Sequence, residues 1–155
     1  MKEKNFMKSA FKDGMIIVFI MIFMLIMTAV VKADSGYGDF GCVAYVRNYD
    51  GDTITVNIPN IHPLLGEKIN IRIRGIDTPE IKAKCEIEKF MALDAKVFVE
   101  NLCQMGKLTL RNISRGKYFR IVADVYVGDI NIGEELIKSG LAVSYDGGTK
   151  KGWCK

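Results

Sequence analysis

Two arginines and two carboxylates lie close together in the sequence, as Arg72, Arg74, Asp77 and Glu80. Isoleucines alternate with polar residues over 69–74, a period of two that predicts a strand with the isoleucines on one face and both arginines on the other. Guanidinium groups bind phosphate through paired hydrogen bonds, while carboxylates hold a hard metal ion or accept a proton. The combination favours phosphodiester chemistry, although a half-exposed strand followed by an ordinary Asp-Thr-Pro-Glu turn would give the same short pattern.

The remaining chain predicts the elements that would position these groups. Period-two patterns bounded by turn residues indicate strands at 40–47, 52–58, 68–76, 108–113 and 118–127, with a loop at 59–66, another at 77–84 and an extended segment at 141–145. Helical spacing predicts a helix that ends before Gly106, and its apolar face is Ile87, Met91, Ala95, Phe98, Leu102 and Met105. A short helix is expected at 132–139, with Asn131 as N-cap and Gly140 after its end.

This order of elements indicates one α+β domain. Three strands, a helix, two strands and a short helix are the layout of a five-stranded OB-type β-barrel, with one helix between strands 3 and 4 and another after strand 5. Such barrels commonly bind oligonucleotides or oligosaccharides, which by itself does not define a reaction.

The N-terminal segment 1–33 has the pattern of a targeting sequence. Lysines precede an unbroken apolar stretch at 15–31, and Val31-Lys32-Ala33 offers a cleavage site after Ala33. We expect a signal peptide at 1–33, a lead-in at 34–39 and the folded domain at 40–155. An uncleaved membrane anchor at 15–31 is the alternative, because this stretch lies between the lengths typical of the two. Either reading predicts an exported domain, periplasmic or secreted, or held at the membrane.

The near-neutral charge of residues 34–155 argues against binding of nucleic acid by a uniformly positive surface. The segment 1–33 holds five of the 22 basic and two of the 18 acidic side chains, so basic and acidic side chains are almost equal in number in the rest of the chain. Phosphate binding must therefore come from local clustering of cations.

Four cysteines remain after the leader, at 42, 85, 103 and 154. In an oxidising compartment they predict two disulfides, with three possible connectivities. A zinc site is not expected, because there is no CxxC and the only histidine is His62, placed in a loop before Pro63.

Three motifs follow one another along the chain: Asp-Gly-Asp-Thr at 50–53, the Arg-Ile-Arg-Gly-Ile-Asp-Thr-Pro-Glu segment at 72–80, and Lys-Tyr-Phe-Arg at 117–120. Together with the Glu-Leu-Ile-x-x-Gly-Leu-Ala segment at 135–142, they resemble the thermonuclease family, whose type member is staphylococcal nuclease. The likeness runs in order from about residue 43 to 145.

The resemblance implies a calcium site. Asp52 and Asp77 match the two calcium carboxylates of the family, and the Thr78 carbonyl matches a further ligand. This agrees with the preference of Ca²⁺ for hard oxygen donors. Asp50 is either only the residue that the turn demands or a support for the metal ligands.

The resemblance also implies the residues that act on the substrate. Glu80 matches the residue that activates or orients the attacking water, and Arg72 and Arg120 match the two phosphate ligands. Lys117 and Tyr118 match positions that line the nucleotide pocket.

Three further residues near these motifs are an arginine and two tyrosines, with Phe119 beside one of them. Arg74 lies off the motif and is expected to be a solvated or substrate-steering charge. Tyr118 and Phe119 would alternate faces if they begin a strand, so one would be core and the other a stacking surface. Tyr145 is a candidate second base-stacking aromatic.

The chain departs from the family pattern in two ways. It stops soon after Tyr145, where the type member continues into a third helix, and it has four cysteines where the type member has none. We expect disulfides to substitute for the helix. The hypothesis is a Cys42–Cys103 pair between the first strand and the helix end, and a Cys85–Cys154 pair that ties the C-terminal tail to the active-site loop.

These inferences predict an exported, calcium-dependent nuclease. By the resemblance it would hydrolyse single-stranded and double-stranded DNA and RNA with little sequence preference, leave 3′-phosphate ends, and act as a monomer without an obligate protein partner. The alternative is a non-catalytic OB-type nucleic-acid-binding module. The complete set of two metal acids, base and two arginines favours the nuclease.

Overall fold

The computed structural model describes residue 21 and residues 37–150 and 152–154. The chain divides into two compact units, Met1–Ser35 and Gly36–Lys155. The signal peptide or anchor expected at 1–33 lies outside the described residues apart from Met21, and the lead-in at 34–39 is described from Tyr37 onward. Within the described part of the chain, no helix has the length and apolar character needed to cross a membrane.

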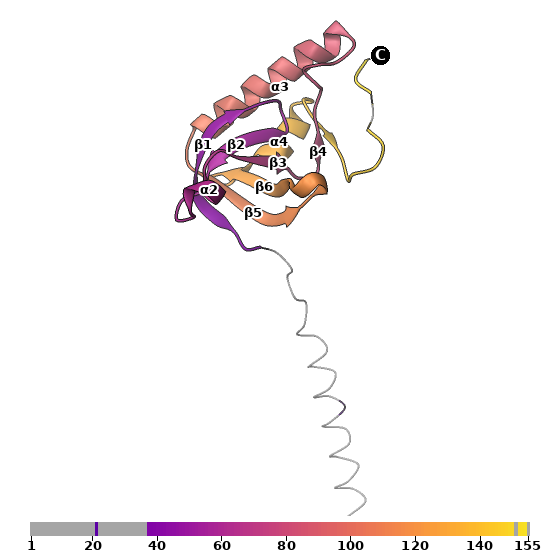
Figure 1. Ribbon diagram of the computed structural model, residues 1–155. Helices are drawn as coiled ribbons and strands as arrows, with labels where there is room; N and C mark the ends of the chain where they lie inside the picture. The colour runs from indigo at the N-terminus through magenta and orange to yellow at the C-terminus, as the bar shows by residue number, and fades with distance from the viewer. Residues whose placement is uncertain (1–20, 22–36, 151, 155) are drawn as a thin grey trace, which may run out of the picture. The chain divides into compact units, whose positions relative to one another are not determined.

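A closed five-stranded barrel forms the second unit (Figure 1). Its strands are β1 (Phe40–Asn48), β2 (Thr53–Asn57), β3 (Ile69–Ile73), β5 (Leu108–Arg115) and β6 (Ile121–Val127). Neighbouring strands pair in the order β3-β2-β1-β5-β6, and a parallel pairing of β3 with β6 closes the barrel. This is the OB-type barrel that the sequence predicts, with all five strands in the expected order.

Helices and short strands complete the domain. They are α2 (Pro63–Gly66), β4 (Ile76–Asp77), α3 (Glu86–Gln104), the 3-10 turn η1 (Lys117–Phe119), β7 (Ile130–Asn131), α4 (Ile132–Lys138) and β8 (Val143–Ser144). The loop expected at 59–66 contains the single turn α2, because Pro63 suits a first helical position and His62 Nδ1 accepts a hydrogen bond from the Leu64 N–H at 3.2 Å. The helix α4 starts as expected, with Asn131 Oδ1 accepting from the Gly133 N–H at 2.9 Å.

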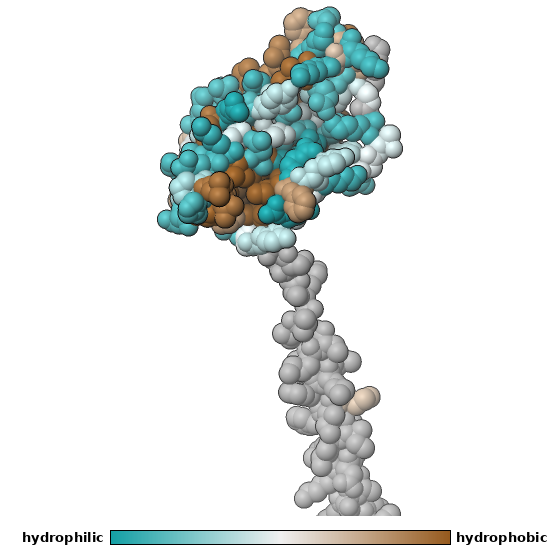
Figure 2. All heavy atoms as spheres, viewed as in Figure 1, coloured by the Kyte–Doolittle hydropathy of each residue, from teal (hydrophilic) through white to brown (hydrophobic). Residues whose placement is uncertain are grey.

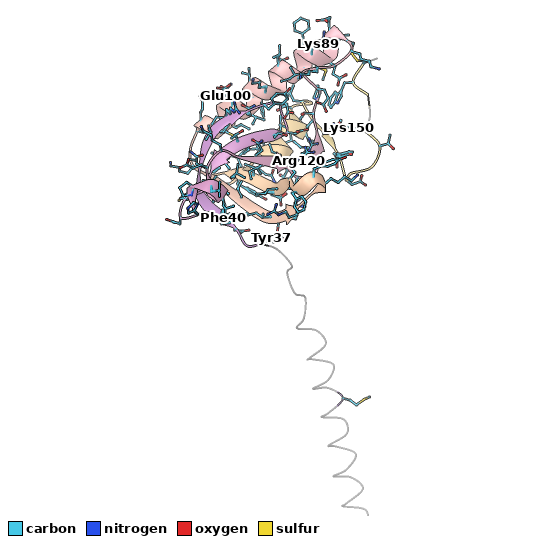
Figure 3. All side chains as sticks on the ribbon, viewed as in Figure 1. Tyr37, Phe40, Lys89, Glu100, Arg120 and Lys150 are labelled. Carbon is cyan, nitrogen blue, oxygen red and sulfur yellow. A yellow bond between two sulfur atoms is a disulfide. The ribbon has the colours of Figure 1, made fainter. Side chains whose placement is uncertain are left out.

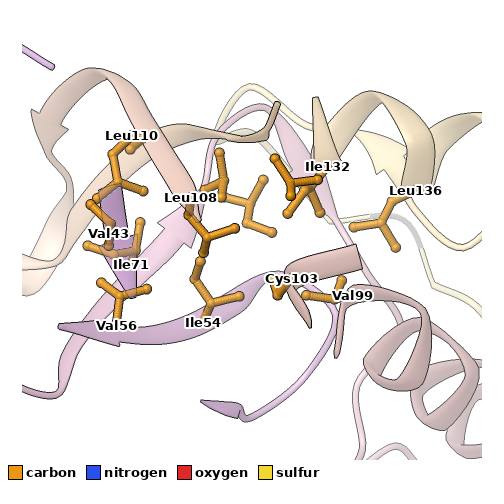
Figure 4. Packing of buried hydrophobic residues seen from close by; sticks show 14 of the residues in the cluster. Val43, Ile54, Val56, Ile71, Val99, Cys103, Leu108, Leu110, Ile132 and Leu136 are labelled. Carbon is orange, nitrogen blue, oxygen red and sulfur yellow. The ribbon is translucent and has the colours of Figure 1, made fainter. Parts of the chain in front are cut away.

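The barrel interior is filled by aliphatic side chains from every strand (Figure 4). Ile71 and Ile73 of β3 are fully buried there, so the expected division of β3 into an apolar and a basic face is confirmed. Ile132 and Leu136 of α4 and Val99 of α3 close the ends of this core.

The helix α3 covers the barrel with a face that agrees only in part with the expected one. Of the expected residues, Ala95 is buried and Phe98 and Leu102 pack against the core, whereas Ile87 and Met105 are exposed. The fully buried residues of the helix are Ala92, Ala95, Val99 and Cys103. An apolar stripe remains on the outer side, where Figure 2 shows brown side chains along α3; it consists of Ile87, Phe90, Leu93 and Val97.

The strand expected at 118–127 begins three residues later. Tyr118 and Phe119 both have left-handed backbone angles, with φ of 58° and 57°, within η1. They are 88% and 83% exposed, so the expectation that one of them enters the core is wrong. A left-handed conformation cannot continue a strand, and the turn directs both rings outward.

One of the two expected disulfides is present. Cys85 and Cys154 are bonded across 69 residues of sequence, whereas Cys42 and Cys103 are free thiols. The pairing of these two is wrong because their side chains lie on opposite sides of the barrel wall. Cys42 is exposed, at an irregularity of β1 where its φ is 57° and the pairing with β5 shifts register, while Cys103 is buried in the core.

Candidate active site

The Asp-Gly-Asp-Thr motif forms the turn between β1 and β2. Asp50 Oδ1 accepts hydrogen bonds from the backbone N–H groups of Asp52 at 3.1 Å and Thr53 at 2.8 Å, which fixes the turn. Asp52 is thereby directed inward and is only 2% exposed, and the Thr53 hydroxyl donates to Asp52 Oδ1 at 2.9 Å. Asp50 therefore shapes the loop that carries Asp52.

A close approach at Gly51 joins this turn to α3 and to the Thr-Pro turn. A Cβ at this position would lie 2.8 Å from Ala95 Cβ and 2.9 Å from Thr78 Cγ2. Only glycine leaves room for these contacts, which bring Asp52 and Thr78 into one region.

Arg72 lies between the two buried acids. Strand pairing places Arg72 opposite Thr53, and its guanidinium reaches Asp52 Oδ1 at 2.5 Å and Asp77 Oδ1 at 3.6 Å. It also donates to the Ile76 carbonyl at 3.1 Å, which holds the guanidinium against the exit of β3. The side chain is partly exposed, so one edge of the guanidinium remains open to a ligand.

Asp77 is the second buried acid, 2% exposed. Its Oδ1 accepts no well-aligned hydrogen bond from any described residue, and the cations nearest to it are Lys150 Nζ at 2.8 Å and Arg72 at 3.6 Å. A buried carboxylate oxygen without an aligned donor is costly unless a cation satisfies it. The Asp52 and Asp77 carboxylates are buried hard oxygen groups of the kind that Ca²⁺ prefers as ligands.

Glu80 lies at the exposed rim of the same site. Its backbone N–H donates to Glu88 Oε1 of α3 at 3.2 Å. Its Oε1 is 2.6 Å from Lys150 Nζ, so one ammonium group contacts both Glu80 and Asp77. Figure 3 labels Lys150 on the side of the barrel that also carries Arg120.

Burial and charge alter the ionisation of these groups. Burial, followed by repulsion from Asp50, raises the pKa of Asp52 to about 6, against the opposing effect of Arg72 and the Thr53 hydroxyl. Burial lowers the pKa of Lys150, but its contacts with Asp77 and Glu80 outweigh this, so the pKa is raised and the ammonium stays charged. A bound cation would favour the ionised form of Asp52.

A cavity of about 820 Å³ opens in front of these residues. Six cationic side chains line it: Arg72, Arg74, Arg115, Lys117, Arg120 and Lys150. Three carboxylates line it as well: Asp50, Glu80 and Asp146. The local clustering of cations that a near-neutral domain needs for phosphate binding is therefore present.

The cavity unites most of the residues expected from the motifs. Arg72, Glu80, Lys117, Arg120 and Tyr145 all line it. Asp52, Asp77 and Thr78 lie buried beneath it, and Asp52 and Asp77 contact its lining through Arg72. Tyr118 does not line the cavity; it lies next to Lys117, with its ring exposed.

Arg120 enters the cavity from the other half of the chain. The parallel pairing of β3 and β6 places Arg72 opposite Val122, two residues after Arg120. Among residues 37–150 and 152–154, Arg120 has no ion-pair partner. It is therefore available for an anionic ligand.

Arg74, expected to be a solvated or substrate-steering charge, lines the cavity but is also held by other side chains. It pairs with Asp124 at 3.4 Å and donates to Ser114 Oγ at 2.8 Å and to the Asn112 carbonyl. These contacts fasten β3 to β5 and β6, so Arg74 supports the wall of the cavity.

Two residues of the site were not anticipated from the motifs. Lys150 and Arg115 both line the cavity, yet Lys150 belongs to a polar tail and Arg115, the last residue of β5, follows the predicted strand at 108–113. Charged residues are common at such positions. The nearest sequence signal for Lys150 is Cys154, four residues later, because its pairing with Cys85 returns the tail to the start of α3.

A second group of potential metal ligands has another explanation. Cys85, Glu88 and Cys154 lie close together, but the two cysteines are bonded to each other and offer no thiolates.

The OB-type barrel thus carries two buried acids beneath a cavity lined by cationic side chains. Residues 70–152, more than half of the chain, match the family described as staphylococcal nuclease homologue. The chain belongs to this family, and the resemblance expected from the motifs is confirmed.

Curated relatives share this region. The chain is 38% identical over 99 residues to endonuclease YncB of Bacillus subtilis, covering 62% of this chain and 44% of that protein. It is 34% identical over 91 residues to the probable endonuclease C19F8.04c of Schizosaccharomyces pombe, covering 54% and 40%. It is also 36% identical over 99 residues to the prophage-derived endonuclease YokF of B. subtilis, covering 62% and 31%. The chain thus spans less than half the length of these relatives.

Proposed function

We propose that this protein is a calcium-dependent nuclease that hydrolyses phosphodiester bonds of DNA and RNA. The observation that carries the proposal is the pair of buried acids, Asp52 and Asp77, bridged by Arg72 beneath a cavity with six cationic side chains. The two buried carboxylates offer hard oxygen ligands for a divalent cation, and the cationic side chains in front of them suit a phosphate. Membership in the nuclease family and the endonuclease names of the relatives support the same reaction.

The metal would be held by the Asp52 and Asp77 carboxylates and the Thr78 carbonyl. Calcium, when bound, would polarise a phosphate oxygen and neutralise charge that builds up on the phosphoryl group. Asp77 supports this assignment, because its buried carboxylate is contacted by cations, the Lys150 ammonium at 2.8 Å and the Arg72 guanidinium at 3.6 Å, whose place a metal ion could take.

Glu80 is the candidate base for the attacking water. Its side chain is exposed at the cavity rim, and the Lys150 ammonium links it to Asp77, one of the two proposed metal ligands. A carboxylate here can accept the proton of a water molecule as the water oxygen attacks phosphorus. Breaking the bond from phosphorus to the 5′-oxygen then leaves a 3′-phosphate and a 5′-hydroxyl, which takes up a proton from solvent.

Arg72 and Arg120 would stabilise the charge of the five-coordinate phosphorus. Both line the cavity, and each guanidinium can donate two parallel hydrogen bonds to phosphate oxygens. Donors aimed at developing charge contribute on the order of 3–4 kcal/mol apiece to catalysis.

Recognition of the substrate would be independent of sequence. Lys117 and the other cavity cations contact the backbone, while Tyr118 and Tyr145 offer rings for base stacking. Such contacts suit single strands of DNA or RNA and the unpaired regions of duplexes. We further propose that the protein is exported and acts as a monomer; the leader pattern at 1–33 and the Cys85–Cys154 disulfide support export.

Digestion of single-stranded DNA and of RNA by the purified full chain tests this function. Glu80→Gln should abolish cleavage, whereas Glu135→Gln, which changes a glutamate of α4 outside the cavity, should retain it. Products of the unaltered chain should carry 3′-phosphate and 5′-hydroxyl ends. Nucleic-acid binding without cleavage in calcium, magnesium or manganese would favour the binding module instead.

A further inference from the structure

Lys150 contacts two of the carboxylates on which the proposed reaction depends. Its Nζ lies 2.8 Å from Asp77 Oδ1 and 2.6 Å from Glu80 Oε1. The first of these residues is a proposed metal ligand and the second the proposed base. One ammonium group therefore occupies both acids at once, while 45% of the lysine side chain stays exposed.

The segment that carries Lys150 is anchored at both ends. On one side, β8 pairs with β4, and the Tyr145 N–H donates to the Gly75 carbonyl at 2.8 Å. The Tyr145 hydroxyl donates to the Gly148 carbonyl at 2.9 Å, which shapes the next turn. On the other side, the disulfide of Cys154 fastens the chain to Cys85, immediately before α3.

Anchoring at both ends keeps the ammonium near its partners. A group tethered by a short linker has an effective concentration in the millimolar range, and simultaneous anchoring restricts it further. A second anchor beyond the lysine therefore favours the closed arrangement, in which Lys150 contacts Asp77 and Glu80.

We propose that Lys150 is a built-in competitor of the metal ion, held in place by the Cys85–Cys154 disulfide. This inference rests on the proposed function. Binding of a divalent cation at Asp77 Oδ1 competes with the ammonium, since two cations in contact with one oxygen repel each other strongly. Displacement of the ammonium also frees Glu80 to accept a proton, so metal binding and activation of the base are coupled through one side chain.

The size of the effect follows from the two contacts. An exposed ion pair, such as that of Lys150 with Glu80, changes an equilibrium by a factor of a few. The contact with Asp77 should contribute more, because Asp77 is buried. We expect Lys150→Met to raise calcium affinity about five- to thirtyfold. Loss of the tether in Cys154→Ser should raise it by a smaller factor, because the lysine remains but is held less often in place.

Calcium binding to the full chain, measured by titration calorimetry, tests the inference without reference to activity. Lys117→Met is the matched control, because Lys117 lines the same cavity and its replacement changes the charge equally. Among the described residues, Lys117 has no carboxylate partner. Its replacement should therefore change calcium affinity by about twofold or less, through long-range charge alone.

A double-mutant comparison separates the tether from other effects of the disulfide. Cys154→Ser should raise calcium affinity severalfold when Lys150 is present and by less than about twofold in the Lys150→Met background. Circular dichroism of each variant would verify that the barrel remains folded.

Two results would overturn the proposal. Equal affinities of Lys150→Met and Lys117→Met, with calcium binding intact, would refute the competition and leave the proposed nuclease standing. Absence of calcium binding in every variant, Lys150→Met included, would refute both the competition and the calcium site of the proposed function.

Discussion

Replacement of Gly51 by alanine tests how closely the 50–53 turn, which carries Asp52, packs against α3 and Thr78. The added Cβ would lie 2.8 Å from Ala95 Cβ and 2.9 Å from Thr78 Cγ2, whereas carbon atoms in contact prefer about 3.5–4.0 Å. Neither neighbour can give way cheaply, because Ala95 Cβ is fixed to the backbone of α3 and Thr78 is buried. Relief requires a shift of the turn or of the helix.

The expected cost is that of overpacking a well-filled interior, about 1–3 kcal/mol of unfolding free energy. This is a large share of a typical stability of about 5–15 kcal/mol. Because the shift moves Asp52 relative to Thr78, calcium affinity should fall as well.

Gly106→Ala is the matched control, since its Cβ would be 3.6 Å from Val127 Cγ2, an ordinary contact. Its unfolding free energy should be unchanged or increased by a few tenths of a kcal/mol, as fewer unfolded conformations become accessible. Urea unfolding followed by circular dichroism measures both variants. If Gly51→Ala proved as stable as Gly106→Ala, the close approach of turn and helix described here would be wrong.

Three further outcomes follow from the site and its surroundings. Arg72→Lys should lower kcat about 10²- to 10³-fold, because a point charge cannot replace the guanidinium fork. Arg74→Lys, which changes a residue paired with Asp124, should lower kcat much less. Similar losses of kcat in both variants would argue against a direct role for Arg72. Tyr118→Ala should weaken binding of single-stranded DNA by about 1–3 kcal/mol in fluorescence anisotropy, and an unchanged affinity would remove its ring from the binding surface. Iodoacetamide at pH 8 should label exposed Cys42 in the folded protein but not Cys103, whose pKa burial raises to about 12 from 9.0. The pKa of Cys103 is higher in the folded than in the unfolded state. The stability that Cys103 contributes is therefore fully present below about pH 9 and is lost as the pH rises toward 12. Unfolding curves at pH 8 and 10 would measure this loss.

The core of the site could be predicted from sequence because its parts are local. Arg72 and Asp77 lie in one short segment, and the pairing of β2 with β3 brings Asp52 to Arg72 through the Thr53–Arg72 register. A hairpin with alternating apolar residues fixes that register almost by itself. The motifs therefore carried enough information to bring these groups together.

Long-range contacts account for what the sequence did not reveal. Lys150 reaches the acids only because β8 pairs with β4 and because a disulfide spans 69 residues. Neither contact has a periodic signal in the tail. The ion pair of Arg74 was not predicted because its partner, Asp124, belongs to β6, far along the chain from β3.

The errors in the cysteine pairing and in the face of α3 have related causes. Spacing places Cys42 and Cys103 near neighbouring elements but does not reveal which side of the barrel wall each side chain faces. Periodicity similarly favours the largest apolar residues as the buried face of a helix, whereas α3 buries the small Ala95, which lies against Gly51, and leaves Ile87 and Met105 exposed. Tyr118 shows a third limit, since a left-handed turn of bulky residues has no propensity signal.

The most direct test of the central claim is cleavage of a fluorescent single-stranded oligonucleotide by the full chain across a calcium titration. The unaltered chain and Asp94→Asn, a change on the exposed side of α3, should cleave with a rate that rises with calcium, saturates, and vanishes in excess chelator. Asp77→Asn should lose cleavage at every calcium concentration that saturates the control. A rate indifferent to calcium, or full activity in Asp77→Asn, would contradict the assignment of the buried acids as the metal site of a nuclease.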